Sequence, residues 1–299
     1  MARPIWGWES TDFYGTATNL AERRSSLAAT SVGGYALFGG GYYHMTGSYN
    51  GTITGEDDWA IVDAYNQSLT KTTVSDLSVG RSRLAAATIS NHALFVGGYS
   101  RDDHEPNYMD ACYAVDAYDQ SLVRTSPAQL TLGTEYCGAT AIGDYALFGG
   151  GNFLGYTNKM YAYNKSLVQS LPSALSVARG RLNATTVGNY ALFAGGRTSS
   201  SAVATVDAYT TTLTLISTTQ LSVARTSPCA VTVGNYALFC GGDWSTATCK
   251  TVDAYDTNLT RISCADLPTY GMNLAGTTLR DWAIISGGNN VTYDYNATY

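Results

Sequence analysis

Histidine and cysteine are the residue types in this chain best able to carry catalysis, and neither forms a catalytic pattern. The 299 residues include three His and six Cys. A Ser-His-Asp or Cys-His site would have to use His44 or His104, because His92 replaces a tyrosine that recurs at equivalent positions of the chain. The cysteines show no C-x-x-C spacing and indicate no disulfide framework. We therefore predict that the protein is not an enzyme and has no catalytic residues.

Carboxylates are the next group that could do chemistry, since calcium is bound by oxygen ligands. They gather in two segments, 56–58 and 102–110, but no D-x-D-x-D-G loop accompanies them. We expect solvated loop charge there and leave calcium binding open. The sequence predicts no metal site and no cofactor.

Recognition chemistry is better represented, in the stretches 42–61 and 99–114. Tyrosine and tryptophan provide a large contact area with a polar tip at low entropic cost, which suits the binding of a sugar or a peptide. The alternative is that the two stretches pack on each other and cover the centre of the fold. The candidate ligand-binding residues in them are Tyr42, Tyr43, His44, Tyr49, Trp59, Tyr99, Arg101, His104 and Tyr108.

The elements that must position these residues form a repeat. A leucine precedes, by 16 residues, an alanine that opens a hydrophobic run, and this happens six times. Repetition at this period predicts a β-propeller, with one supersecondary unit per repeat. The pairs are Leu20 and Ala36, Leu77 and Ala93, Leu130 and Ala146, Leu175 and Ala191, Leu221 and Ala237, and Leu267 and Ala283.

Each unit predicts four short strands. In the fourth unit, two runs flank the hairpin dipeptide Gly188-Asn189, and the second run ends at the double glycine Gly195-Gly196. Glycine there permits a positive φ or a close backbone approach. A third strand ends at Tyr209, and a fourth begins near Leu213.

A four-stranded unit with a terminal double glycine and a third-strand tyrosine resembles the Kelch repeat, and the resemblance runs from Asp12 to the end of the chain. The fourth-strand tryptophan common in Kelch repeats is absent. Phrases such as VGNYALF and VDAYDTNLT are similar to those of bacterial and phage-encoded Kelch proteins. The resemblance implies a propeller and a context in a bacterial or phage protein.

The two ends of the repeat are complementary, because the last unit stops where a fourth strand would open. We predict an all-β, six-bladed β-propeller of four-stranded antiparallel blades, closed by an N-terminal strand over 13–20 that pairs near 293–296. Residues 12–299 form this single domain. Residues 1–11, with Trp6 and Trp8, are an extension that we expect to anchor the propeller or to dock to an assembly partner.

Antiparallel topology places the loops between blades on the same face as the two long stretches, opposite the hairpin turns. An arginine recurs there as Arg24, Arg81, Arg179 and Arg225, and an aspartate recurs on the third strand. Residues that recur in most repeats are expected to be structural. We expect the arginines to donate hydrogen bonds to backbone carbonyls. The variable neighbours are better ligand contacts, namely Arg83, Glu135, Tyr136, Arg181, Tyr270, Met272 and Asn273.

Composition excludes several partner classes. The net charge is -6, and no Lys/Arg cluster exceeds Arg23-Arg24, so we expect no nucleic-acid partner. No apolar run is long enough for membrane insertion, and the N-terminus has no signal-peptide pattern. Synthesis in the cytoplasm is expected, with virion association left open.

These observations favour a non-enzymatic propeller that recognises a surface glycan through the long-loop face, in a phage virion or tail-associated receptor-binding module. An intracellular protein-interaction scaffold is the first alternative. A sugar isomerase or lyase is the second.

Overall fold

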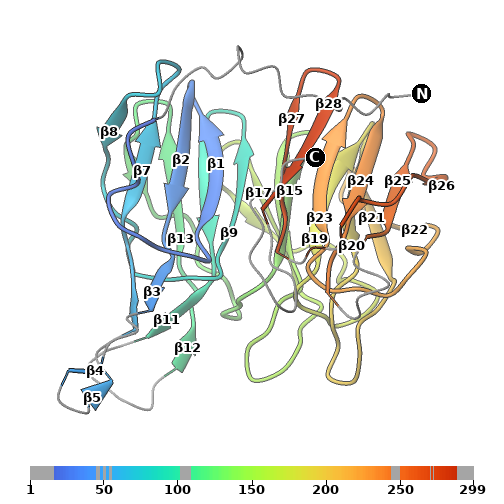
Figure 1. Ribbon diagram of the computed structural model, residues 1–299, viewed down its shortest axis with the longest axis horizontal. Coiled ribbons are helices and arrows are strands. Elements are labelled where there is room, and N and C mark those ends of the chain that lie inside the picture. Colours follow the sequence, from blue (N-terminus) through green and yellow to red (C-terminus); the bar gives the residue numbers. More distant parts are fainter. Residues whose placement is uncertain are drawn as a thin grey trace.

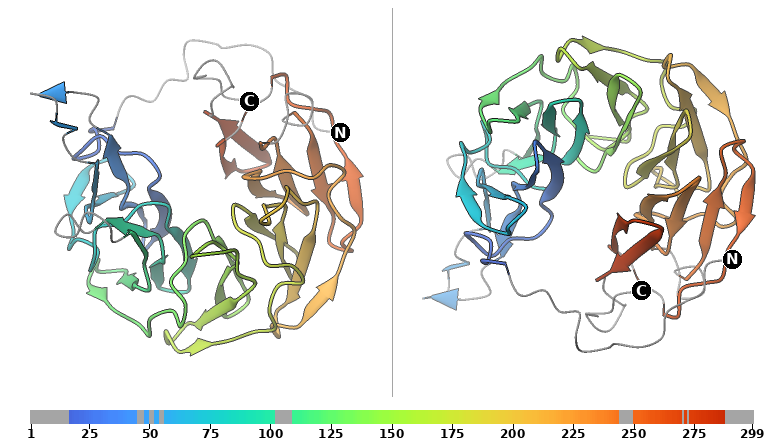
Figure 2. Two further views of the ribbon diagram at one scale, coloured as in Figure 1. Left: turned by 90° about the horizontal axis from the view of Figure 1, so that it is seen from below. Right: turned by 90° about the horizontal axis from the view of Figure 1, so that it is seen from above.

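The computed structural model describes residues 17–44, 48–49, 52–53, 56–101, 109–243, 250–269, 271 and 273–287. Every regular element in these ranges is a β-strand. The strands form antiparallel sheets that stand as blades around a central axis (Figure 2). The protein is an all-β, six-bladed β-propeller, as the sequence predicts.

Five blades are described with four strands each, and the sixth with two (Figure 1). Blade one comprises β1 (Ala28–Val32), β2 (Tyr35–Gly39), β7 (Val62–Tyr65) and β8 (Lys71–Thr73). Blade two comprises β9 (Ala85–Ile89), β10 (His92–Val96), β13 (Val115–Asp119) and β14 (Arg124–Thr125). Blade three comprises β15 (Gly138–Ile142), β16 (Tyr145–Gly149), β17 (Met160–Asn164) and β18 (Gln169–Ser170). Blade four comprises β19 (Asn183–Val187), β20 (Tyr190–Ala194), β21 (Val206–Thr210) and β22 (Leu215–Ser217). Blade five comprises β23 (Cys229–Val233), β24 (Tyr236–Cys240), β25 (Val252–Tyr255) and β26 (Arg261–Ser263), and blade six includes β27 (Ala275–Leu279) and β28 (Trp282–Ser286).

The inner hairpin of each blade follows from its turn dipeptide. In blade one, Val32 pairs with Tyr35 across Gly33 and Gly34, whose φ values are 57° and 83°. Positive φ at both turn residues matches the twist of the flanking strands. The first strands of neighbouring blades contact one another and line the centre of the ring (Figure 2).

The recurring arginine and aspartate are structural, as predicted. Arg179 donates to the carbonyls of Val177, Phe193 and Gly195, and it pairs with Asp207 at 2.8 Å. The matching pairs Arg24–Asp63, Arg81–Asp116 and Arg225–Asp253 are 2.7 to 2.8 Å long, and all four arginine side chains are fully buried. Each pair ties the loop before a blade to that blade's third strand.

The predicted ring closure lies largely outside the described residues, because 13–16 and 293–296 are not among them. The described part of the closing segment, 17–20, contains no strand. Its Thr18 carbonyl accepts from the hydroxyl of Tyr65, just as Ser75 accepts from Tyr118 in the next blade. Residues 17–20 therefore take the place of the linker that follows a fourth strand elsewhere. The extension 1–11 lies outside the described residues, and none of the described ranges contains a helix able to cross a membrane.

Candidate ligand-binding site

The long connections of blades one and two are ribbons of paired strands, where irregular loops were expected. β3 (Tyr42–His44) pairs with β6 (Glu56–Asp58), and β4 (Ser48–Tyr49) pairs with β5 (Thr52–Ile53). β11 (Tyr99–Arg101) pairs with β12 (Met109–Ala111), and β11 contacts β6. Figure 1 shows both ribbons on the face opposite the inner hairpin turns. Pairing of these strands provides hydrogen-bond partners for the backbone of long segments that lie away from the blades.

Each loop between blades places one residue in a ring around the centre of this face. These six residues all have left-handed φ values, from 47° to 56°. Backbone hydrogen bonds join five of them in succession, with Arg83 N donating to Ser26 O at 2.8 Å and Tyr136 N donating to Arg83 O at 3.1 Å. Arg181 N then donates to Tyr136 O, and Ser227 N donates to Arg181 O. We call this set the inner ring, and its members are Ser26, Arg83, Tyr136, Arg181, Ser227 and Asn273.

Over blades two to four, the inner ring carries a stack of guanidinium groups and tyrosine rings. The Arg83 guanidinium lies 4.8 Å from the centre of the Tyr99 ring and 5.3 Å from that of Tyr136. The Arg181 guanidinium lies 4.3 Å from the centre of the same Tyr136 ring. Glu135 binds Arg83 at 2.9 Å. The order along the stack is therefore Tyr99, Arg83, Tyr136, Arg181.

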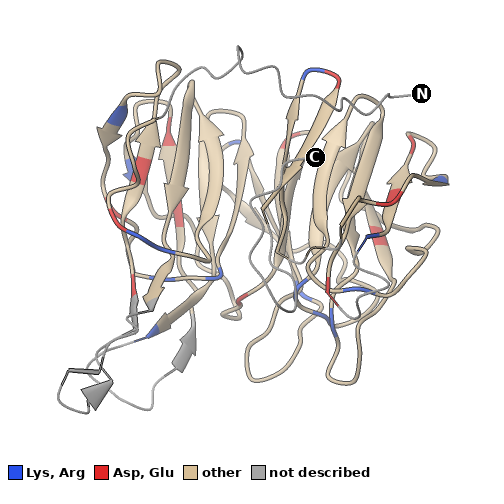
Figure 3. Ribbon diagram, viewed as in Figure 1, with Lys and Arg blue, Asp and Glu red and all other residues tan. Residues whose placement is uncertain are grey.

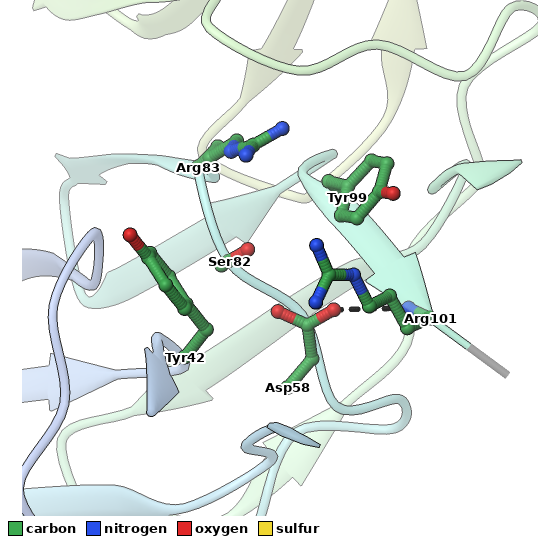
Figure 4. A pocket seen from close by; sticks show the side chains of 6 residues that line it. All are labelled: Tyr42, Asp58, Ser82, Arg83, Tyr99 and Arg101. Atoms are coloured by element: carbon green, nitrogen blue, oxygen red, sulfur yellow. Dashed lines mark hydrogen bonds between the residues drawn. The ribbon is translucent and has the colours of Figure 1, made fainter. Parts of the chain in front are cut away.

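A small polar cavity of about 70 Å³ opens beside this stack. Blade one supplies Tyr42 and Asp58 through β3 and β6, and β11 of blade two supplies Tyr99 and Arg101. In Figure 4 the Arg101 guanidinium lies between the Tyr99 ring and the Asp58 carboxylate, which accepts a 2.9 Å bond from Arg101 N. The lining is completed by Ser82 and Arg83.

Burial and charge keep the stack in one protonation state near neutral pH. Burial raises the pKa of Tyr99 and of Tyr136, and the positive charge of Arg83 opposes this only in part. Burial lowers the pKa of Arg83, but its hydrogen bond to Glu135 and the electrostatic effects of Tyr136, Glu135 and Tyr99 together outweigh burial, and the pKa ends above its ordinary value. The phenols are therefore neutral donors, and the guanidinium is charged.

Seven of the predicted ligand contacts come together here, namely Tyr42, Arg83, Tyr99, Arg101, Glu135, Tyr136 and Arg181. Tyr43 lies instead in a separate groove with residues 19–24.

Trp59, a candidate ligand contact, is only partly exposed and lies against the blades. Its backbone N–H donates to Gly41 O, and its backbone carbonyl accepts from Arg81 N. The buried indole Nε1 has no hydrogen-bond partner in the part of the chain that the structure describes.

The other predicted contacts are not tested. His44 and Tyr49 lie in β3 and β4, but their side chains fall outside the description, and His104, Tyr108 and Tyr270 lie outside the described residues altogether. Of the acidic residues considered as calcium ligands, Asp102, Asp103 and Glu105 also lie outside the described residues, and the side chains of Glu56, Asp57 and Asp110 fall outside the description. The described residues contain no group of three or more His, Cys, Asp or Glu placed to hold a metal ion.

Asp58 and Ser82 are cavity residues that the sequence did not single out as ligand contacts. Ser82 follows the recurring Arg81, and it forms a bridge with Tyr99, which follows the double glycine Gly97-Gly98. The same bridge joins Ser25 to Tyr42 in blade one. Ser82 could therefore have been found from the sequence, because it stands directly after the recurring arginine.

No family model matches the chain, and no curated protein is similar to it in sequence. Among solved structures, that of YjhT superimposes with a TM-score of 0.68 over 94% of this chain and 96% of YjhT, at 10% sequence identity. The chain has the fold of YjhT. At that identity the likeness supports the propeller architecture and carries no residue role. The Kelch character of the repeat rests on the sequence resemblance alone.

Proposed function

We propose that this protein is a non-enzymatic binding propeller that recognises a surface glycan through the face bearing the two ribbons. The observation that carries the proposal is the stack of Tyr99, Arg83 and Tyr136 beside the polar cavity. It places aromatic faces and hydrogen-bonding groups within one concave site. Small-molecule sites are typically built in this way, from flat apolar surfaces and a few placed polar groups.

The cavity favours a sugar over a peptide side chain. Its polar lining includes a carboxylate from Asp58, a hydroxyl from Ser82 and the phenol of Tyr42. Sugar hydroxyls both donate and accept hydrogen bonds, so they can satisfy such a mixed set. A protein partner usually anchors a large aromatic or aliphatic side chain in a desolvated pocket. The polar lining of this cavity does not suit such an apolar anchor.

The biological setting we propose is a phage virion or tail-associated receptor-binding module. The similarity of the repeated sequence segments to those of phage-encoded Kelch proteins supports this setting. The ribbons project from one face, while the inner hairpin turns occupy the other (Figure 1). Attachment through the hairpin-turn face or through residues 1–11 would leave the ribbon face open to a ligand.

A glycan array probed with the purified protein tests the function, with Tyr99→Ala and Tyr136→Ala as site variants. Each substitution removes a ring of the stack, so binding should fall at least about tenfold, because an aromatic contact contributes on the order of 1 kcal/mol beyond its buried area. Tyr236→Ala removes a ring that is 44% exposed on the hairpin-turn face and serves as the matched control.

Three results would contradict the proposal. One is glycan binding that survives in both site variants. The second is the absence of any glycan signal together with specific capture of one protein, which would favour an interaction scaffold. The third is turnover of a bound sugar, which would favour an isomerase or a lyase.

A further inference from the structure

Arg181 differs from the four recurring arginines of the loops between blades and from Arg83, the other arginine of the inner ring. Arg24, Arg81, Arg179 and Arg225 are buried against aspartates, and Arg83 is held by Glu135. The Arg181 side chain is exposed, and its guanidinium makes neither a hydrogen bond nor an ion pair with any described residue. The guanidinium lies on the face of Tyr136, 4.3 Å from the ring centre.

This arrangement holds a free positive charge in a defined orientation. A guanidinium that lies on a ring keeps its N–H donors at its edge, where they can form two parallel bonds to a carboxylate. Stacking also restricts the side chain before a ligand arrives, so that less rotamer entropy is lost on binding. The left-handed backbone at Arg181, with φ of 55°, is fixed by hydrogen bonds to Tyr136 and Ser227.

We propose that the ligand is an acidic oligosaccharide and that Arg181 binds its carboxylate. This inference rests on the proposed function and names the class of glycan. The stack runs from the cavity at Tyr99 and Arg83 across Tyr136 to Arg181. A ligand that fills the cavity and also reaches Arg181 must pass over Tyr136. It therefore has at least two units, with the acidic one over blade four.

The local charge favours an anion, although the whole chain carries -6. Blue segments, which mark lysine and arginine, occur where the blades end at the ribbon face (Figure 3). The stack and the cavity hold three guanidinium groups, of Arg83, Arg101 and Arg181, against two carboxylates, of Asp58 and Glu135, so the local balance is positive by one charge.

The test uses an array of uronic and other sugar-acid oligosaccharides, each printed beside its methyl ester, which differs only in charge. The free acid should bind at least about tenfold more tightly than its ester, as expected for a charge-assisted hydrogen bond. Arg181→Gln should remove this preference, and Arg181→Lys should restore it in part. Lys165→Gln removes one positive charge from an exposed turn on the hairpin-turn face, and the preference should persist in this control.

Equal binding of acid and ester, or an acid preference that persists in Arg181→Gln with an unchanged melting temperature, would overturn the inference. Binding of oligoglutamate in place of every sugar acid would also overturn it. Binding of neutral glycans that depends on Tyr99 and Tyr136 but not on Arg181 would leave the proposed function standing and remove only the acidic class. The absence of any glycan signal would remove both.

Discussion

At the scale of single residues, the buried arginine–aspartate pair changes as a unit from blade to blade. Blade three has Thr134 and Tyr161 at the two positions, and the sequence of the sixth repeat has Gly271 and Tyr293 there. Thr134 Oγ1 donates to Gly150 O, which matches the bond from Arg179 Nε to Gly195 O. Tyr161 Oη accepts from Leu132 N, in place of the carboxylate that accepts from Ser176 N in blade four. Each neutral residue therefore keeps one hydrogen bond of the kind that the charged residue makes.

Transplanting the neutral pair into blade four tests this equivalence. Arg179→Thr alone leaves the Asp207 carboxylate buried without its partner, and Asp207→Tyr alone leaves the Arg179 guanidinium buried without its partner. Each single substitution should therefore lower the free energy of unfolding by about 3 to 5 kcal/mol. The double variant should cost clearly less than the sum of the two. Urea denaturation of the four proteins gives the coupling energy as a double-mutant cycle. Strict additivity would mean that the two positions are independent.

At the scale of elements, the double glycine sets how closely one blade approaches the next. Gly150 has φ of 70°, and a Cβ there would lie 2.4 Å from the carbonyl oxygen of Arg179 in the next blade. The following residue, Gly151, donates its N–H to that same carbonyl at 2.8 Å. Equivalent contacts recur at Gly40, Gly97 and Gly195. The glycines therefore serve both the turn and the interface between blades.

Gly150→Ala and Gly234→Ala separate these two effects. Both glycines have left-handed φ, so both substitutions should cost about 1 to 2 kcal/mol of backbone strain. Gly234 has open space around its Cβ position, whereas Gly150 meets backbone. Gly150→Ala should therefore be several kcal/mol more destabilising by chemical denaturation, within the range of severe core changes. Equal losses would show that the close approach is unimportant.

At the scale of the whole molecule, buried tyrosines join each blade to the linker that precedes it. Tyr118, Tyr209 and Tyr255 each pack edge-on against a second-strand phenylalanine and donate their hydroxyl to a linker carbonyl. Burial raises the pKa of each phenol far above its ordinary value, and a neighbouring aspartate adds to the rise. Burial likewise raises the pKa of the Cys229 thiol to about 12.

These shifts predict alkaline unfolding. The folded state holds its phenol and thiol protons more tightly than the unfolded state, so their contribution to stability is complete below the unfolded pKa values and is lost above them. The urea midpoint should stay level up to about pH 8.5, fall as the unfolded thiols titrate, and fall more steeply above about pH 10. Tyr209→Phe should lose about 1 kcal/mol at pH 8 but show a shallower alkaline slope. An unchanged midpoint between pH 8 and 11 would contradict this account.

The sequence by itself determined the blades, because their signals are local and occur six times. The turn dipeptides, the double glycines and the alternation of small and large apolar residues each act within a few positions of the backbone. Repetition then separates what every blade needs from what varies. The structural roles of the repeated arginine and aspartate followed from the same comparison, and the joint replacement of the two by Thr134 and Tyr161 could have been found in it.

Only the tertiary structure decided which of the similar residues meet at the site. Tyr42 and Tyr43 are neighbours on β3, yet they line different cavities, because successive side chains of a strand point to opposite sides. Arg179 and Arg181 stand two positions apart, but one is buried on Asp207 and the other lies exposed on Tyr136. The left-handed turn of the inner ring, and the approach of one blade to the next, separate them. Both depend on contacts between distant segments, which a local pattern does not encode.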